Sequence, residues 1–352
     1  MNSWTGDEPA ALEAWAEVAG RVWRHRPVLP PPDPGRLGAT LTRLSNWALP
    51  RHFAVPGKAA LMAWHLPDGV TGHLGAFEAM PEPEAAGRVL QEALAWLHER
   101  GAKVALGPID GDAWERTRFS LGPEDEPAFL LEPENPPEYP LFWEAAGGSI
   151  SHRVWTQVQE DPRAAAETLA DHVRSVKEAG YRIAPVTGRS WRQDLKDLKA
   201  LVPEVFAGGL PLAPMAEADF VARFAPFSPL WRSGLSFVAR DAGGKAVGFL
   251  LGLPDLRPWL GRAGGLAGRL GLAWRITHPR RAVLKTLGVA PAHRRVALGH
   301  ALAYAFHRRA AALGVPTVLH ALMAEGNPSR HMSDKLGARV CRSHALFKWD
   351  LR

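Results

Sequence analysis

The order of apolar and polar positions along the chain predicts alternating strands and amphipathic helices. Short apolar or alternating runs are typical of strands, whereas apolar residues spaced by three and four are typical of helices. The clearest helix covers residues 84–100, and Gly101 follows it at the position of a C-terminal cap. Its expected buried face consists of Val89, Leu90, Ala93, Leu94 and Leu97.

The same patterns assign elements to most of the chain. In the first half they predict strands at residues 59–65, 71–80, 103–106 and 150–159, and helices at 10–23, 37–47, 84–100 and 161–179. In the second half they predict strands at 181–186, 235–240, 246–253, 282–289, 317–324 and 340–351, and helices at 191–206, 216–224, 296–313 and 328–336. Residues 256–281 interrupt the pattern, and we expect a solvated insertion there.

Parts of the two halves resemble each other at a nearly constant distance along the chain. The offset between matching positions is 212 or 213 residues, for Leu74-Gly75 with Leu287-Gly288, Gly87 with Gly299, and Gly101 with Gly314. Each set brackets a strand, a long helix and a second strand, which indicates an internal duplication. We therefore predict an α/β fold with a mixed (α+β) sheet, in two tandem domains at residues 1–160 and 181–352 joined by a linker helix at 161–180.

Composition narrows the class of protein. The single cysteine, Cys341, excludes an internal disulfide framework and a cysteine-rich zinc module, and we expect no metal site. No apolar run approaches the ~20 residues of a membrane helix, so we expect no membrane span. The first residues lack the pattern of a signal peptide, so the expected compartment is the cytoplasm.

Charge is distributed unevenly along the chain. Residues 1–160 hold 13 basic and 22 acidic residues, whereas residues 256–352 hold 17 basic and 3 acidic ones. Such asymmetry indicates an anionic partner at the C-terminal end, although basic residues also serve solubility. The insertion at 256–281 contributes six arginines, no acids, Trp259 and Trp274, a composition that also fits contact with RNA or a membrane surface.

One segment carries a candidate binding motif. The strand predicted to end at Val289 is followed by a helix start of the pattern Arg-x-x-Ala-x-Gly, which begins at Arg294. Small residues there leave backbone N–H groups open at the positive end of the helix dipole, where an anion such as a pyrophosphate can bind. The segment consists of Arg294, Arg295, Val296, Ala297, Leu298, Gly299, His300 and Ala301.

The order of these motifs resembles the GCN5-related N-acetyltransferase (GNAT) superfamily. The matching residues in the second half are Leu287-Gly288-Val289, Pro291, Arg294 to Ala301, Asn327 and Leu336-Gly337 with His344 to Phe347. The first half resembles the leading domain of bacterial tandem members at Gly75-Ala76-Phe77, Gly107-Pro108, Gly111-Asp112, Asn135 to Tyr139 and Phe142 to Gly148. The resemblance implies two tandem acyl-CoA N-acyltransferase-like domains.

The resemblance also implies where acetyl-CoA or another acyl-CoA would bind as cosubstrate. A splayed strand ending in Leu287, Gly288 and Val289 would pair with the pantetheine arm, and Arg294 to Ala301 would hold the pyrophosphate. Asn327 would lie near the acetyl end. The equivalent helix of the first half begins with Glu82 and Glu84, which would repel a pyrophosphate, so we expect only the second domain to bind CoA.

The sequence is less informative about catalysis. Many superfamily members resemble one another in a tyrosine four residues before the glycine of Leu336-Gly337, where this chain has Ser333. The strand before the phosphate loop holds Lys285 and Thr286 where a carboxylate base is common. Glu325 is the remaining candidate for the catalytic carboxylate, with a solvated loop acid as the alternative interpretation.

Three functions remain open at this stage. The first is an N-acetyltransferase that moves an acetyl group from acetyl-CoA to an unidentified amine on a small molecule or peptide. The second is a tRNA-dependent aminoacyltransferase of the same tandem fold, favoured by the basic residues 256–281. The third is a non-catalytic CoA-binding protein, favoured by the missing tyrosine. The sequence specifies neither the acceptor, the acyl chain nor the oligomeric state.

Overall fold

The computed structural model describes residues 2–5, 9–24, 33–122, 126–260 and 265–352. The first half contains β1 (Asn2–Thr5), α1 (Pro9–Trp23), α2 (Pro34–Leu44), β2 (Leu49–Val55), β3 (Ala59–His65), β4 (Thr71–Ala79), α3 (Pro83–Glu99), β5 (Val104–Gly107), β6 (Phe119–Ser120), α4 (Glu138–Ala145) and β7 (Ser149–Gln159). It therefore contains the predicted strand–helix–strand unit, β4–α3–β5.

The second half contains α5 (Pro162–Leu169), α6 (Asp171–Glu178), β8 (Arg182–Pro185), α7 (Trp191–Val205), α8 (Glu217–Phe224), the 3₁₀ helix η1 (Ala225–Ser233), β9 (Phe237–Arg240) and β10 (Ala246–Pro254). It continues with α9 (Arg257–Leu260), α10 (Gly265–Thr277), β11 (Arg281–Val289), the 3₁₀ helix η2 (Pro291–Val296), α11 (Leu298–Ala312), β12 (Thr317–Ala324), α12 (Pro328–Lys335) and β13 (Arg339–Asp350). The equivalent unit of this half is β11–α11–β12.

Within the described residues, thirteen strands form one mixed sheet, so the predicted fold class is confirmed. The order along the sheet is β1-β2-β3-β4-β5-β13-β7-β12-β11-β10-β9-β8, and β6 pairs with β13. The two parallel pairs are β4 with β5 and β11 with β12, one in each half, while the neighbouring pairs are antiparallel. This symmetry agrees with the internal duplication that the sequence indicates.

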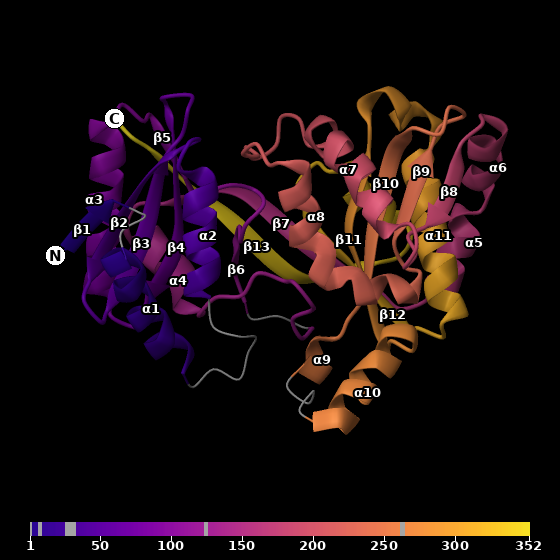
Figure 1. The fold of residues 1–352 in the computed structure, drawn as a ribbon, viewed down its shortest axis with the longest axis horizontal. Helices are drawn as coiled ribbons and strands as arrows, with labels where there is room; N and C mark the ends of the chain where they lie inside the picture. The colour runs from indigo at the N-terminus through magenta and orange to yellow at the C-terminus, as the bar shows by residue number, and fades with distance from the viewer. Residues whose placement is uncertain (1, 6–8, 25–32, 123–125, 261–264) are drawn as a thin grey trace.

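The last strand of each half is inserted beside the other half. β13 lies between β5 and β7, and β7 lies between β13 and β12. Figure 1 shows these two strands running through the middle of the molecule, between a lobe formed by the first half and a lobe formed by the second. Strands from before and after residue 160 belong to one sheet. The division into domains at residues 1–160 and 181–352 therefore stays a prediction from the sequence.

Several elements differ from the sequence-based expectation. The expected linker helix is two helices, α5 and α6, that meet at Ala170. Residues 49–55 form β2, a strand that the sequence pattern did not indicate. The insertion is not a loop, because the described residues of 256–281 include α9 and α10, while residues 261–264 lie outside the described part. Alanine, leucine and arginine favour this helical state over a loop.

The core of the first half depends on aromatic side chains from both ends of the chain. Phe347 of β13 is fully buried, and its ring lies 5.9 Å from that of Trp143 and 6.3 Å from that of Phe119. The Trp349 ring lies 5.2 Å from that of Trp143. β13 therefore contributes packed side chains as well as main-chain pairing to the first half.

The described helices include none that is both long and apolar enough to cross a bilayer.

Replacing Phe347 by alanine tests the strand insertion. Removing a fully buried aromatic ring costs about 3–5 kcal/mol of folding free energy. Because β13 belongs to the second half but pairs with β5, β6 and β7 of the first half, we expect Phe347→Ala to lower the urea midpoint of both halves together, in one transition followed by circular dichroism. Val340→Ala on the same strand, where the side chain is 43% exposed, should move the midpoint little. Two separate transitions, with only one moved, would contradict this interpretation.

Candidate active site

β11 and β12 separate after four paired residues. Their parallel pairing runs from Arg281 with Thr317 to Leu284 with His320. Beyond that point β12 stays paired with β7, and β11 stays paired with β10 as far as Val289. Residues 285–289 therefore have, on the side of β12, no pairing strand among the described residues. The splayed strand implied by the family resemblance is present, and its free edge can accept an extended ligand.

The loop after β11 leads into the start of α11. The 3₁₀ helix η2 is followed by Ala297, which has a φ of +54° and precedes the first turn of α11. That turn begins with Leu298 and Gly299, whose N–H groups are at the positive end of the helix. A Cβ added at Gly299 would lie 3.4 Å from Leu287 Cδ2, which is ordinary contact, so the start of α11 lies directly beside β11.

The structure places the predicted cosubstrate residues as follows. Arg294 donates from Nε to the Val289 carbonyl at 3.0 Å and from Nη2 to the Val205 carbonyl at 3.2 Å, so these donors hold the loop. Arg295 is exposed at the same turn. The His300 ring lies 4.6 Å from that of His172, and burial, followed by His172 and Lys335, lowers the His300 pKa.

Asn327 and Glu325 lie after the splayed end of β12. The Asn327 side chain caps α12 by accepting a hydrogen bond from the Ser329 N–H at 2.9 Å. Both Asn327 and Ser329 line the cavity described below. Glu325 is exposed and is not among the described residues that line this cavity. The structure thus brings Asn327 to the splayed strands and leaves Glu325 outside.

A cavity of about 1640 Å³ lies between the two halves and reaches the splayed strands. From the second half it includes residues 284–287 of β11 and 320–324 of β12, and from the first half residues 113–118 and 131–134. Its aromatic lining consists of Trp15, Trp23, Trp114, Trp191, Phe206, Phe220, Phe224, Phe227, Trp231, Phe237 and Phe249. Such a cavity suits an acceptor with a large apolar part.

Lys285 lies where the free edge of β11 meets this cavity. Its Nζ donates to the Leu131 carbonyl at 3.1 Å and lies 5.2 Å from the centre of the Phe129 ring. Burial, followed by the charge of Arg118, lowers the pKa of Lys285 to about 7, against a weaker opposing effect of Glu132. A lysine of this pKa is partly neutral at neutral pH, so it can accept a proton.

Glu134 lies in the cavity wall and forms an ion pair with Arg257. Burial raises the pKa of the Glu134 carboxyl, against the effect of Arg257. Its second oxygen, Oε2, is buried without a hydrogen-bond partner among the described residues. Two cavity groups, Lys285 and Glu134, therefore have pKa values shifted toward neutrality, which is typical of sites that transfer protons.

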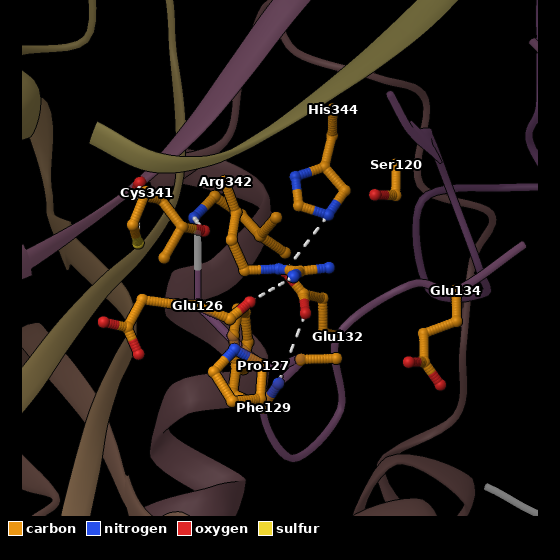
Figure 2. A network of polar contacts seen from close by, with 12 residues as sticks. Ser120, Glu126, Pro127, Phe129, Glu132, Glu134, Cys341, Arg342 and His344 are labelled. Atoms are coloured by element: carbon orange, nitrogen blue, oxygen red, sulfur yellow. Dashed lines mark hydrogen bonds and ion pairs between the residues drawn. The ribbon is translucent and has the colours of Figure 1, made fainter. Parts of the chain in front are cut away.

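Glu132 has a different role from its neighbour. Its Oε1 accepts a hydrogen bond from Arg342 Nε at 2.6 Å and lies 3.2 Å from His344 Nε2. Figure 2 shows Arg342 and His344, both from β13, directed at this carboxylate. Burial acts to raise the pKa of the Glu132 carboxyl, but His344 and Arg342 hold it below its usual range. The carboxylate therefore ties the segment before β7 to β13.

Ser333, at the position of the family's tyrosine, is fully buried. Its Oγ lies 2.6 Å from His320 Nδ1, and His320 Nε2 lies 3.1 Å from His307 Nε2. Burial lowers the pKa of His320 to about 4, and that of His307 is also lowered, so both rings are neutral at neutral pH. His320 and His344 are both buried, as core histidines are.

In the first half, the space between the separating strands β4 and β5 is filled by the protein itself. β4 and β5 pair from Thr71 to His73, and the chain after β5 then closes in, since the Ile109 N–H donates to the Leu74 carbonyl at 2.8 Å. Further along β4, the main-chain N–H and carbonyl of Ala76 also have hydrogen-bond partners within the protein. Ala76 donates its N–H to Asp110 Oδ1 and accepts from Trp15 Nε1, both at 2.6 Å.

Sequence reasoning missed Lys285 and Glu134 as candidate site residues. The sequence shows Lys285 only as an unexpected residue at the position of a common base, and Glu134 lies between predicted elements without a motif of its own. Neither residue carries a local signal of burial, because the other half of the molecule buries each of them. Among the described residues, no group of three or more histidine, cysteine, aspartate or glutamate side chains could hold a metal ion.

Known proteins resemble this chain in its fold and, over part of its second half, in its sequence. Residues 212–338 match the sequence profile of the acetyltransferase (GNAT) family. A conserved protein of unknown function from Enterococcus faecalis V583, described as a probable N-acyltransferase, is 11% identical with a TM-score of 0.52, covering 100% of this chain and 73% of that one.

Two further solved structures are similar. The first is a GCN5-related glucosamine N-acetyltransferase region of a fungal multi-domain GH3 β-N-acetylglucosaminidase, which is 14% identical with a TM-score of 0.52, covering 99% of this chain and 38% of that one. The second is a tandem GNAT protein from the clavulanic acid biosynthesis pathway, which is 14% identical with a TM-score of 0.48, covering 99% and 98%. No curated protein matches the sequence. The family resemblance of the sequence is confirmed.

Proposed function

We propose that the chain is a member of the GCN5-related N-acetyltransferase superfamily, whose profile its residues 212–338 match, and that its second half binds an acyl-CoA and transfers the acyl group to an amine held in the cavity. The observation that carries this proposal is the free edge of β11 at residues 285–289, which opens on the cavity beside the first turn of α11. The cosubstrate supplies a thioester, whose carbonyl carbon an amine can attack. Acetyl-CoA is the simplest such donor.

Each part of the second half has one task in this proposal. The backbone of Leu287, Gly288 and Val289 pairs with the amides of the pantetheine arm. The N–H groups of Ala297, Leu298 and Gly299 at the start of α11 hold the pyrophosphate, and the exposed Arg295 adds positive charge. The N–H groups of His300 and Ala301 donate to the Ala297 carbonyl instead. Arg294 holds the loop through the Val289 carbonyl. Asn327 stands at the acyl end, where it lines the cavity.

Lys285 replaces Glu325 as the proposed base. Neutral Lys285 Nζ takes a proton from the acceptor ammonium, and the freed nitrogen lone pair forms the new amide bond as the carbon–sulfur bond breaks. The departing thiolate takes the proton from Lys285, and the second proton of the acceptor nitrogen leaves to solvent. Lys285 lies in the cavity wall, whereas Glu325 lies outside it.

The first half has no cosubstrate in this proposal. Asp110 and Trp15 already use the main-chain groups of Ala76 on its splayed strand, and its helix α3 begins beside Glu82 and Glu84. Its contribution is one wall of the acceptor cavity, through residues 113–118 and 131–134.

Matched glycine substitutions test the binding site. Gly299→Asp places a carboxylate at the first turn of α11, where it repels a pyrophosphate yet is compatible with a helix start. We expect its affinity for CoA, measured by calorimetry, to fall at least tenfold. The control is Gly87→Asp in α3, at the equivalent position of the first half, where an added Cβ meets nothing within 4 Å. The proposal fails if Gly299→Asp leaves CoA affinity unchanged or if Gly87→Asp reduces it equally.

Lys285 is tested by the pH dependence of thiol release from acetyl-CoA, measured with a panel of primary amines. We expect kcat/KM of the native protein to rise with pH through a value near 7, as Lys285 loses its proton. Lys285→Met should lower kcat/KM about 10²–10⁴-fold and remove this pH limb, while CoA affinity is retained. If the Lys285→Met variant keeps the rise of kcat/KM with pH and the Glu134→Gln variant loses it, Glu134 is the base instead. Absence of thiol release with every amine would favour the non-catalytic alternative.

A further inference from the structure

The helices α9 and α10 form an exposed apolar surface that the proposed reaction does not use. Ten large apolar side chains are exposed among the described residues, and four of them lie between positions 260 and 274. They are Leu260, Leu266, Leu270 and Trp274, with exposed fractions of 37%, 75%, 62% and 52%. Figure 1 shows both helices at the lower edge of the molecule, projecting away from the sheet.

The apolar side chains of α10 lie on one face of the helix. Leu266, Leu270 and Trp274 follow one another at a spacing of four, which aligns them along the helix. Ile276 is buried and Leu272 is partly buried against the protein, so a different face attaches α10 to the core. The exposed face is thus free of the contacts that fix the helix.

Basic side chains lie in the same segment as this apolar face. Arg269 and Arg280 are exposed, and residues 256–281 contain no acidic residue. The Arg275 guanidinium lies 4.1 Å from the ring centre of Trp259 and 4.7 Å from that of Trp274. The His278 ring is stacked on Trp274 at 4.4 Å. Trp274 is therefore held in place by the protein and is presented with positive charge beside it.

From these features we propose that α9 and α10 dock on the surface of an anionic lipid bilayer. An amphipathic helix that combines leucine and tryptophan with arginine lies in the bilayer interface, where the apolar residues meet acyl chains and the arginines meet anionic headgroups. The long arginine side chains reach the headgroups while their stems stay among the apolar residues.

Other occupants fit these residues less well. RNA would use the arginines and Trp274, but Leu266 and Leu270 would gain nothing from phosphates or base edges. A second copy of this chain would bring its own arginines against Arg269 and Arg280, and like charges would oppose the contact. An anionic bilayer satisfies both the apolar stripe and the charge.

The docked orientation also places the cavity close to the lipid. α10 packs against η1, whose residues Phe227 and Trp231 line the cavity. An acceptor with an apolar part would then reach the cavity along this side. The docking itself does not depend on the reaction, and it can be tested without an activity assay.

The experiment measures co-sedimentation of the full chain with vesicles of equal parts phosphatidylglycerol and phosphatidylcholine. We expect the native protein to pellet with these vesicles, and to pellet at least fivefold less with phosphatidylcholine alone or in 0.5 M salt. Leu266→Ser/Leu270→Ser/Trp274→Ser should reduce the partition coefficient at least tenfold. The control is Leu141→Ser, which changes an equally exposed leucine of the first half and should pellet like the native protein.

A second variant keeps the proposal testable if the triple serine variant does not fold. Arg269→Glu/Arg280→Glu alters exposed charges alone, and it should reduce binding to the anionic vesicles while the circular dichroism spectrum is unchanged. Failure of the native protein to pellet, or equal pelleting of the triple serine variant, would overturn the proposal. Retention of bulk tRNA on filters in place of vesicle binding would overturn it too, as would a dimer that the triple variant loses.

Discussion

The pairing of β13 with β7 is the interaction on which the rest of this structure depends. It joins the two halves into one sheet, because each strand is the last of its own half and lies between two strands of the other half. The charged contact of Glu132 with Arg342 and His344 fixes the segment before β7 to the same strand. The cavity lies between the halves, so its shape and its access to β11 follow from this pairing.

The two halves use the same unit in opposite ways. In the second half, β11 leaves β12 after Leu284 and keeps a free edge. In the first half, the equivalent space is occupied by the chain after β5 and by the side chains of Asp110 and Trp15. One copy of the unit thus keeps an open strand edge, while the other copy is closed and the first half supplies one wall of the cavity. This division explains why a chain with two such units is proposed to have one transfer site.

The surroundings of Lys285 show how tertiary structure changes the chemistry of a residue. On an isolated strand its ammonium would be hydrated and fully protonated at neutral pH. In the folded chain it faces the carbonyl of Leu131 and the ring of Phe129, both from the first half, and its pKa falls to about 7. Contacts between residues more than 150 positions apart therefore create the candidate base.

The sequence by itself determined the repeated strand–helix–strand unit, the fold class and the position of the loop before α11, since these depend on local periodicity and on small residues at a helix start. It also localised the positive charge to the last quarter of the chain. It could not place β13 in the first half or Lys285 in a cavity, and it led to Glu325 because exposure is not visible in a linear pattern. It predicted a solvated insertion where α9 and α10 lie, because the glycine and arginine residues there obscure the helical periodicity. Only the tertiary structure decided which side chains become buried together, because that burial comes from pairing between distant strands.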